Sequence, residues 1–433
     1  MSQRFYVETL GCPKNQVDSD KIVGTLLADG MQATDDVGAA DLVVVNTCAF
    51  IDDARKESID TILALEEHRA EGSRLVVTGC MAERYGAELA EALPEVDQVA
   101  GFGVPVGRPV APNGRQLIPV GSAPLPVLDL LNLPRPKSTS PWAYVKIAEG
   151  CDRSCGFCAI PSFRGPQRSR DISQILTEVD ELQAREIVLV AQDLASFGKD
   201  RPDELGAGAI VPLVEAVAAR VDRVRLLYLY PSDLSDALID AMLATGVPYF
   251  DLSLQHVSKP LLRRMRRWGD GDRFLRRIEE IRDRDADAAF RSNFIVGYPG
   301  ETESDHDQLL AFVEAAQLDW CGFFAYSPEE GTHAYTLDGA VDRGVMHERL
   351  AELRALQDDI TAGRRDEMIG RTVTVLVDEA GIARSVREAP EIDGVIHVSP
   401  SLAVGEFAEV EIVDAFGPDL VASGGAPIDE DGG

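Results

Sequence analysis

The sequence has few basic residues for its acidic content, and it lacks any long apolar run. It holds 42 Lys and Arg against 73 Asp and Glu, which gives a net charge of −31. A protein that coats nucleic acid needs a net basic face to neutralise phosphates, so this balance argues against that class and favours a basic protein partner. No stretch approaches the roughly 18 consecutive apolar residues that a membrane helix needs. We therefore expect no membrane partner.

The N-terminus also lacks the pattern of a secretory signal. The first five residues contain no apolar core and lead directly into an expected strand. Hydrophobic residues make up 45% of the chain and charged residues 27%, which is ordinary for a folded soluble protein. The sequence therefore predicts a cytoplasmic protein whose 433 residues form about three domains.

Cysteine is scarce as well, with seven residues in the whole chain. In a cytosolic protein of this size, such a number favours metal binding or catalysis over disulfides. Three of the cysteines are widely spaced, three lie within eight residues of one another, and Cys321 stands alone beside an expected strand. We expect Cys321 to be a small core residue.

Residues 1–104 alternate short apolar strands with helices, which predicts an open parallel α/β sheet. The expected strands are Phe5–Leu10, Asp41–Asn46 and Arg74–Thr78. Cys12, Cys48 and Cys80 each follow one of these strands, at the edge of a parallel sheet where ligands bind. We therefore expect the three thiols to converge, although three small buried residues near strand ends are the alternative.

The rest of the chain divides into three further segments. Residues 105–141 hold nine prolines and predict a linker that marks a domain boundary. Residues 142–368 show six strand–helix units, which predict a partial parallel (β/α)6 barrel. Residues 369–433 change to short strands of period two, which predict a small antiparallel β-barrel followed by an acidic tail. The expected fold class is α/β, with the C-terminal β-barrel as a separate unit.

The second group of cysteines forms a CxxxCxxC motif from Cys151 through Cys155 to Cys158. Three thiolates at this spacing can hold three irons of a [4Fe–4S] cluster and leave the fourth iron open to a substrate. A structural zinc site would need a fourth ligand, while zinc with water in the fourth position is the other possibility. The motif follows the first expected barrel strand, at the mouth where barrel sites lie.

This motif, at this place in a six-unit barrel, resembles the radical S-adenosylmethionine (SAM) superfamily. The segment Ile295–Thr302 resembles the glycine-rich motif with which that superfamily contacts the adenosyl part of SAM. The resemblance implies cofactor contacts for Gly297, Gly300 and Glu301, because glycines let the main chain approach a ligand at the start of a helix. Gln192 and Gln255 end two other expected strands, where they would orient SAM or the substrate, or only make strand-end hydrogen bonds.

With the N-terminal cysteines, the resemblance narrows to the methylthiotransferases, which transfer sulfur-containing groups and carry a C-terminal TRAM domain. It implies two [4Fe–4S] clusters: Cys151, Cys155 and Cys158 would hold the one that generates a radical from SAM. Cys12, Cys48 and Cys80 would hold an auxiliary cluster that delivers sulfur, and a second SAM would donate the methyl group. No catalytic residue beyond these ligands is assigned.

Several segments resemble the branch of this family that modifies a ribosomal protein. They are Gly11–Asn15, Val145–Arg153, Ala159–Gly165 and Ala389–Gly394. The resemblance implies methylthiolation of the β-carbon of an aspartate in small-subunit ribosomal protein S12. It also implies a low-potential electron donor such as flavodoxin or ferredoxin, a sulfur donor, and no dedicated tRNA binding.

The net charge of the C-terminal segment helps to distinguish a protein substrate from a tRNA substrate. From Arg371 to the end there are three basic and 13 acidic residues, a net −10. A module that grips tRNA should be basic, whereas one that docks on a basic ribosomal protein should be acidic. The alternatives are a tRNA adenosine methylthiotransferase and a non-catalytic iron–sulfur scaffold that binds RNA.

Arginines near the motif are further candidates. Arg164, Arg168 and Arg170 follow the cysteine loop, and we expect them to line the site. The basic run from Arg263 to Trp268 would contact the substrate carboxylate, an RNA phosphate or acidic neighbours, or form a solvated helix face.

Overall fold

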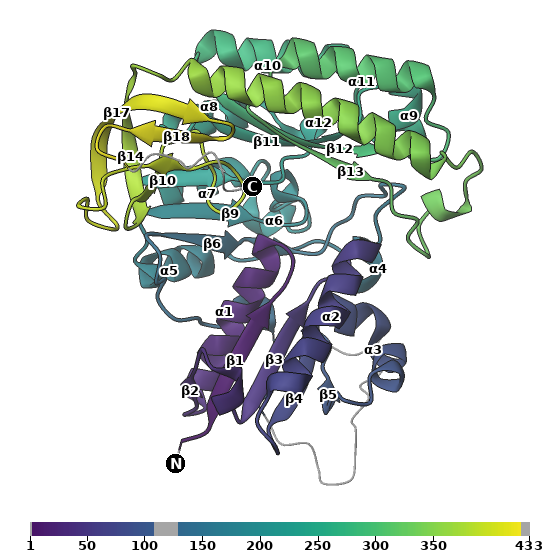
Figure 1. The fold of residues 1–433 in the computed structure, drawn as a ribbon, viewed down its shortest axis with the longest axis vertical. Helices are drawn as coiled ribbons and strands as arrows, with labels where there is room; N and C mark the ends of the chain where they lie inside the picture. The colour runs from purple at the N-terminus through teal and green to yellow at the C-terminus, as the bar shows by residue number, and fades with distance from the viewer. Residues whose placement is uncertain (1, 108–128, 426–433) are drawn as a thin grey trace.

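The computed structural model describes residues 2–107 and 129–425 (Figure 1). Most of the expected proline-rich linker, residues 108–128, and the expected acidic tail, residues 426–433, lie outside the described residues. Among the helices that are described, none has both the length and the apolar character to cross a membrane.

The N-terminal part is a five-stranded parallel sheet in the order β2-β1-β3-β4-β5. Its elements are β1 (Arg4–Thr9), α1 (Pro13–Ala28), β2 (Gln32–Ala33), η1 (Val37–Ala39), β3 (Leu42–Thr47), α2 (Asp52–His68), β4 (Arg74–Gly79), α3 (Cys80–Ala92) and β5 (Gln98–Val99). Every residue of β3 is buried, as its run of valines predicts for a central parallel strand covered on both faces. Helix α1 begins at Pro13, where a missing N–H costs nothing.

The central part is an arc of six parallel strands. They are β6 (Trp142–Lys146), β9 (Glu186–Val190), β10 (Arg223–Leu226), β11 (Tyr249–Gln255), β12 (Ala289–Val296) and β13 (Trp320–Ala325). They form two three-stranded sheets, β10-β9-β6 and β11-β12-β13, that are joined by a bridge between Leu229 and Leu252. The arc is the partial barrel that the six repeats predicted.

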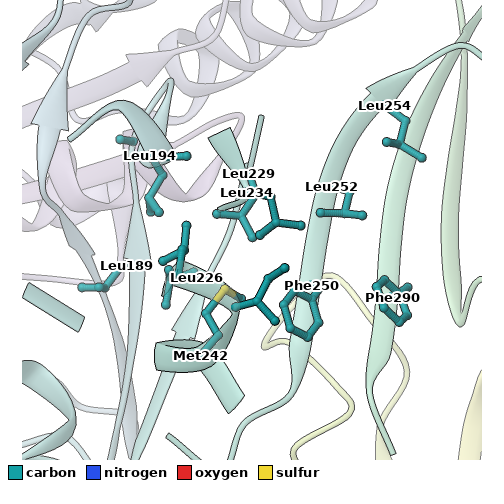
Figure 2. Packing of buried hydrophobic residues seen from close by; sticks show 14 of the residues in the cluster. Leu189, Leu194, Leu226, Leu229, Leu234, Met242, Phe250, Leu252, Leu254 and Phe290 are labelled. Atoms are coloured by element: carbon teal, nitrogen blue, oxygen red, sulfur yellow. The ribbon is translucent and has the colours of Figure 1, made fainter. Parts of the chain in front are cut away.

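Helices cover the outer face of this arc (Figure 1). They are α5 (Ile172–Leu182), α7 (Ile210–Ala218), α8 (Asp236–Ala244), α10 (Gly271–Arg284), α11 (Glu303–Ala316) and α12 (Arg343–Asp366). Figure 2 shows the apolar layer beneath them, in which Met242 of α8 lies beside Leu226 and Phe250, and Phe290 lies beyond Phe250. This burial of apolar surface is the main force that holds helices on strands.

Short elements connect these units at both ends of the strands. They are η2 (Leu130–Asn132), β7 (Ala148–Glu149), α4 (Ile160–Arg164), β8 (Arg168–Ser169), η3 (Leu194–Ser196), α6 (Pro202–Leu205), η4 (Pro231–Asp233), α9 (Lys259–Arg264) and η5 (Ala334–Thr336).

The C-terminal part is a closed β-barrel in the order β14-β15-β16-β18-β17. Its strands are β14 (Thr372–Glu379), β15 (Ile382–Arg384), β16 (Ile396–His397), β17 (Phe407–Phe416) and β18 (Asp419–Ala422). The segment between β15 and β16 packs against the beginnings of the central strands: Tyr249 donates to Asp393 Oδ2 at 2.6 Å, and Trp320 Nε1 donates to the Arg387 carbonyl at 3.0 Å. The C-terminal barrel thereby closes one end of the central arc and leaves the carboxyl ends of its strands for the site.

A buried ion cluster stabilises this closed end. The Glu186 carboxylate accepts hydrogen bonds from Arg225 Nε at 2.9 Å and from Arg384 Nη1 at 3.1 Å, and all three side chains are buried. Burial alone would raise the pKa of Glu186, but the two guanidinium groups outweigh it and lower this pKa to about 2. The carboxylate therefore stabilises the fold at neutral pH. This contribution is lost as the pH falls from the unfolded-state pKa of about 4.3 towards 2.

We expect Glu186→Gln to destabilise the fold by about 3–5 kcal/mol at pH 7, because it leaves buried Arg225 without an anion and leaves Arg384 with Asp378 alone. The measurement is the midpoint of thermal unfolding. The matched control is Glu181→Gln at the exposed end of α5, which should leave the midpoint nearly unchanged. Equal midpoints for both variants would show that the buried cluster contributes nothing.

Candidate functional site

The three widely spaced cysteines lie at the carboxyl edge of the N-terminal sheet. Cys12 is the N-cap of α1, Cys48 follows β3 directly, and Cys80 is the first residue of α3. Gly11 shows how closely two of these segments approach: a Cβ placed on it would lie 2.9 Å from Cys48 Sγ, and its φ of +96° suits glycine. The chain therefore brings the segment before Cys12 against the Cys48 thiol.

The three thiols influence one another's ionisation. Burial, with smaller contributions from the Cys80 and Cys12 sulfurs, raises the pKa of Cys48 to about 11. Burial would also raise the pKa of Cys12, but the nearby cations Lys14 and Arg164 lower it below its ordinary value. Cationic side chains around thiols favour the thiolate, which is the form that binds metals.

The CxxxCxxC loop runs from the end of β7 to the start of α4, at the carboxyl end of β6. Hydrogen bonds to sulfur surround it: the Arg153 main-chain N–H lies 3.4 Å from Cys151 Sγ, and Arg267 Nη1 lies 3.3 Å from Cys155 Sγ. The Gly156 N–H donates to the Met265 carbonyl at 2.8 Å, which ties the loop to the segment after α9. The loop is thus held by its own N–H groups and by the segment after α9, which supplies the Met265 carbonyl and the Arg267 side chain.

Arg164 links the N-terminal cysteines to the residue Glu149, just before the CxxxCxxC loop. It ends α4, which packs on α3, and its Nη2 lies 3.0 Å from Cys80 Sγ and 2.8 Å from Asn15 Oδ1. Its Nη1 donates to Glu149 Oε1, just before the CxxxCxxC loop, at 2.8 Å. One buried guanidinium therefore links the N-terminal sheet to the mouth of the central arc.

A second buried cation strengthens this junction. Lys146 Nζ lies 2.7 Å from Glu149 Oε2 and also contacts Asp18 of α1. Because Lys146 pairs with Asp18 across the interface, separating the domains would break this buried ion pair.

The donor sets fit iron–sulfur clusters. Within residues 2–107 and 129–425, no three His, Cys, Asp or Glu side chains converge as closely as the ligands of one metal ion. The thiolates of a cubane bind different irons, so they lie farther apart than the ligands of a single ion. N–H donors aimed at sulfur, as from Arg153, Arg164 and Arg267, are the partners that stabilise cluster thiolates.

The glycine-rich turn after β12 is held by its own acidic residue. The Glu301 carboxylate accepts from the main-chain N–H groups of Gly297 and Tyr298, and it pairs with Arg349 Nη1 at 3.0 Å. A Cβ on Gly297 would collide with Met346 of α12. This glycine therefore lets α12 pack on the turn.

Gly300 lies in the same turn with a φ of +88°, and a Cβ there would lie 3.0 Å from Arg264 Nε. Met346 and Arg264 thus fill the places where side chains at these two positions would lie. The contact of this turn with SAM stays a prediction.

The two glutamines differ in their surroundings. Gln192 Nε2 donates to Glu149 Oε1 at 2.6 Å, while its buried Oε1 has no hydrogen-bond partner among the described residues. Gln255 ends β11 with a φ of +71°, which is unusual for a residue other than glycine. Gln192 is thus tied to the acid beside the cysteine loop, and both residues lie at the same mouth.

The remaining candidates have structural partners. Arg168 pairs with Asp129 at 2.9 Å and Arg170 with Glu178 at 2.7 Å, so of the three arginines after the loop only Arg164 reaches a cysteine. The basic run is not merely a solvated face, because its Arg267 contacts Cys155. Cys321 packs on the edge of the central hydrophobic cluster, as expected of a core residue.

Three side chains between Cys12 and the central strands, those of Lys14, Tyr228 and Asp251, were not predicted as part of the site. Lys14 Nζ lies 3.3 Å from the centre of the Tyr228 ring. The Tyr228 main-chain N–H, in a residue with a φ of +67°, donates to the Asp251 carboxylate at 2.9 Å. The position of Lys14 two residues after Cys12 was the available signal, but no local pattern shows which strand it faces.

Comparison with known proteins covers all three parts of the chain. Residues 4–101 match a family described as "Uncharacterized protein family UPF0004", residues 145–313 match the Radical SAM superfamily, and residues 369–424 match the TRAM domain.

Several relatives share the whole length. The chain is 41% identical to "Ribosomal protein uS12 methylthiotransferase RimO" of Cutibacterium acnes, over 96% of this chain and 97% of the relative. It is also 41% identical to the proteins of the same name from Saccharopolyspora erythraea, covering 97% and 95%, and Sorangium cellulosum, covering 97% and 90%.

A solved structure shares the fold. It is the radical SAM methyltransferase TsrM from Kitasatospora setae with tryptophan substrate and a SAM analogue, at a TM-score of 0.50 and 14% identity. The match covers 83% of this chain and 89% of that chain.

Proposed function

The chain belongs to the ribosomal protein uS12 methylthiotransferase RimO family, and on that premise we propose that it methylthiolates the β-carbon of an aspartate in uS12. It is a radical SAM enzyme, a transferase of sulfur-containing groups. The observation that carries the proposal is the buried Arg164, which contacts Cys80 of the N-terminal group and Glu149, two residues before the CxxxCxxC loop.

We assign one [4Fe–4S] cluster to Cys151, Cys155 and Cys158 and a second to Cys12, Cys48 and Cys80. When bound, the first supplies the electron that cleaves SAM, and the second supplies the site of sulfur delivery. The residues of the chain hold and tune these groups: Arg267 donates to Cys155 Sγ, and Arg164 donates to Cys80 Sγ. Hydrogen bonds and positive charge at sulfur stabilise the charged thiolates.

Other residues shape the mouth. Glu301 holds the turn of Gly297 and Gly300 through two main-chain N–H groups, and we propose that this turn and the amides of Gln192 and Gln255 contact SAM. The supporting observation is the buried Gln192 Oε1, which lacks a partner among the described residues. A buried amide oxygen left without a donor is costly, so a ligand that donates to it would be favoured.

The roles of the domains, the location of the protein and its partners are also proposals. We infer that residues 1–104, 142–368 and 369–433 work as auxiliary-cluster, radical and substrate-docking domains in the cytoplasm. The net charge of −10 from Arg371 to the end supports docking on a basic ribosomal protein. A low-potential electron donor and a sulfur donor complete the reaction.

The direct test uses the reconstituted enzyme with reductant, SAM and sulfide. It is incubated separately with small ribosomal subunits that lack the modification and with undermodified tRNA. We expect the mass of uS12 to increase by one methylthio group and the tRNA to stay unchanged. Modification of tRNA alone would favour the adenosine branch, and no SAM cleavage would favour the non-catalytic scaffold.

A further prediction concerns Arg164. We expect Arg164→Gln to weaken iron retention at the N-terminal cysteines by roughly 10- to 100-fold, because the variant removes the cation that lies beside Cys80 Sγ. The measurement is iron released to a chelator over time. Arg168→Gln removes an equal charge from an arginine that is paired with Asp129, and it should retain iron like the wild type. Equal release from both variants would contradict a role for Arg164 at the cluster.

A further inference from the structure

Lys14 differs from every other lysine of the protein in its partners. The chain has seven lysines, and the other six each contact a carboxylate or amide oxygen: Lys21, Lys56, Lys137, Lys146, Lys199 and Lys259. In the described part of the chain, no carboxylate lies within ion-pair distance of Lys14 Nζ, which lies 3.3 Å from the centre of the Tyr228 ring. Lys14 is half-buried, and the negative charges of Cys12 and Asp251 act on its ammonium group without pairing with it directly.

The location of this ammonium group is informative. Lys14 lies in the first turn of α1, two residues after Cys12. Tyr228 lies beyond the end of β10, at the mouth of the central arc. Burial, Cys12 and Asp251 together raise the pKa of the Tyr228 hydroxyl. The group therefore lies between the N-terminal cysteines and the interior of the arc.

The backbone of Tyr228 adopts an energetically unfavourable conformation. Its φ of +67° is rare for a residue with a large side chain, and the Asp251 carboxylate holds the Tyr228 N–H at 2.9 Å. Such a conformation persists only where the surroundings impose it, and it is common at functional sites. Asp251 is itself buried, its carboxylate accepts the Tyr228 N–H, and both Arg291 and Lys14 act on its charge from a distance.

From these contacts we propose that Lys14, resting on Tyr228, binds the side-chain carboxylate of the substrate aspartate. This inference rests on the proposed function and adds to it the residue that recognises the substrate's acid group. A partly desolvated ammonium without an anion is unfavourable, and an incoming carboxylate restores a charge-assisted hydrogen bond. Before the substrate binds, the ring of Tyr228 holds the ammonium group in position.

The test is equilibrium binding of isolated uS12 to the reconstituted enzyme, with SAM present and no reductant, so that no turnover occurs. Two forms of uS12 are compared, the natural protein and one with asparagine in place of the target aspartate. We expect Lys14→Met to weaken binding of natural uS12 by roughly 10- to 100-fold. We expect the same variant to leave binding of the asparagine form nearly unchanged, because that form offers no carboxylate.

Two further variants serve as controls. Lys56→Met makes the same chemical change at an exposed residue of α2 and should bind both forms like the wild type. Lys14→Arg retains a cation and should restore part of the preference for aspartate. Iron content and circular dichroism establish that each variant is folded and loaded.

The outcomes separate the possibilities. Equal weakening of both forms of uS12 by Lys14→Met would overturn the proposal, because a purely structural role would not distinguish them. Weaker binding of SAM with unchanged binding of uS12 would also overturn it and would assign the lysine to the methionyl carboxylate. A wild-type enzyme that does not modify uS12 at all would contradict the proposed function instead.

Discussion

We expect the protein to lose about half of its iron, and all formation of 5′-deoxyadenosine, when Cys151, Cys155 and Cys158 are replaced by alanine. The three residues lie on one loop at the mouth of the central arc, and donors from Arg153 and Arg267 point at two of their sulfurs. Without these thiolates no ligands remain there to hold a cluster, so SAM cannot receive an electron. The measurements are iron per chain after reconstitution and deoxyadenosine produced in the presence of reductant.

The matched control for this experiment is Cys321→Ala. Cys321 lies on β13 and packs on the central hydrophobic cluster, so its loss changes packing and not the cysteine loop. The control should retain full iron and full SAM cleavage. Unchanged iron content in the triple variant would show that the assignment of this cluster is wrong.

The second large effect concerns the N-terminal cysteines. We expect replacement of Cys12, Cys48 and Cys80 by alanine to abolish methylthio transfer while SAM cleavage stays measurable. These cysteines lie at the edge of a different sheet from the CxxxCxxC loop, so the radical-generating site keeps all its own thiols. The measurements are the mass of uS12 and the deoxyadenosine formed by the same preparation.

Stability must be controlled in this second experiment, because metal ligation supports local folding. Circular dichroism of the triple variant should retain the helical signal of the wild type. A folded variant that still modifies uS12 would return these cysteines to the role of small buried residues near strand ends. Loss of SAM cleavage together with transfer would instead show that the two sites depend on each other.

The sequence by itself determined the order and type of the units. A continuous apolar run such as Leu42–Val45 predicts a strand buried on both faces, and repeated alternation of strands and helices predicts a parallel sheet. The CxxxCxxC spacing is local as well, so the sequence shows directly that one loop carries three thiols. The placement of Cys12, Cys48 and Cys80 at one sheet edge follows from the same logic.

Only the tertiary structure decided what surrounds these residues. Arg164 reaches Cys80 across 84 positions of sequence, and Lys14 rests on Tyr228 of another domain. The turn with Gly297 looked free for a ligand in the sequence, yet Met346 of α12 fills the space beside it. Periodicity reports which face of an element is buried, but it does not report which distant element covers that face. Contacts between domains arise from docking of whole surfaces, and no local pattern encodes them.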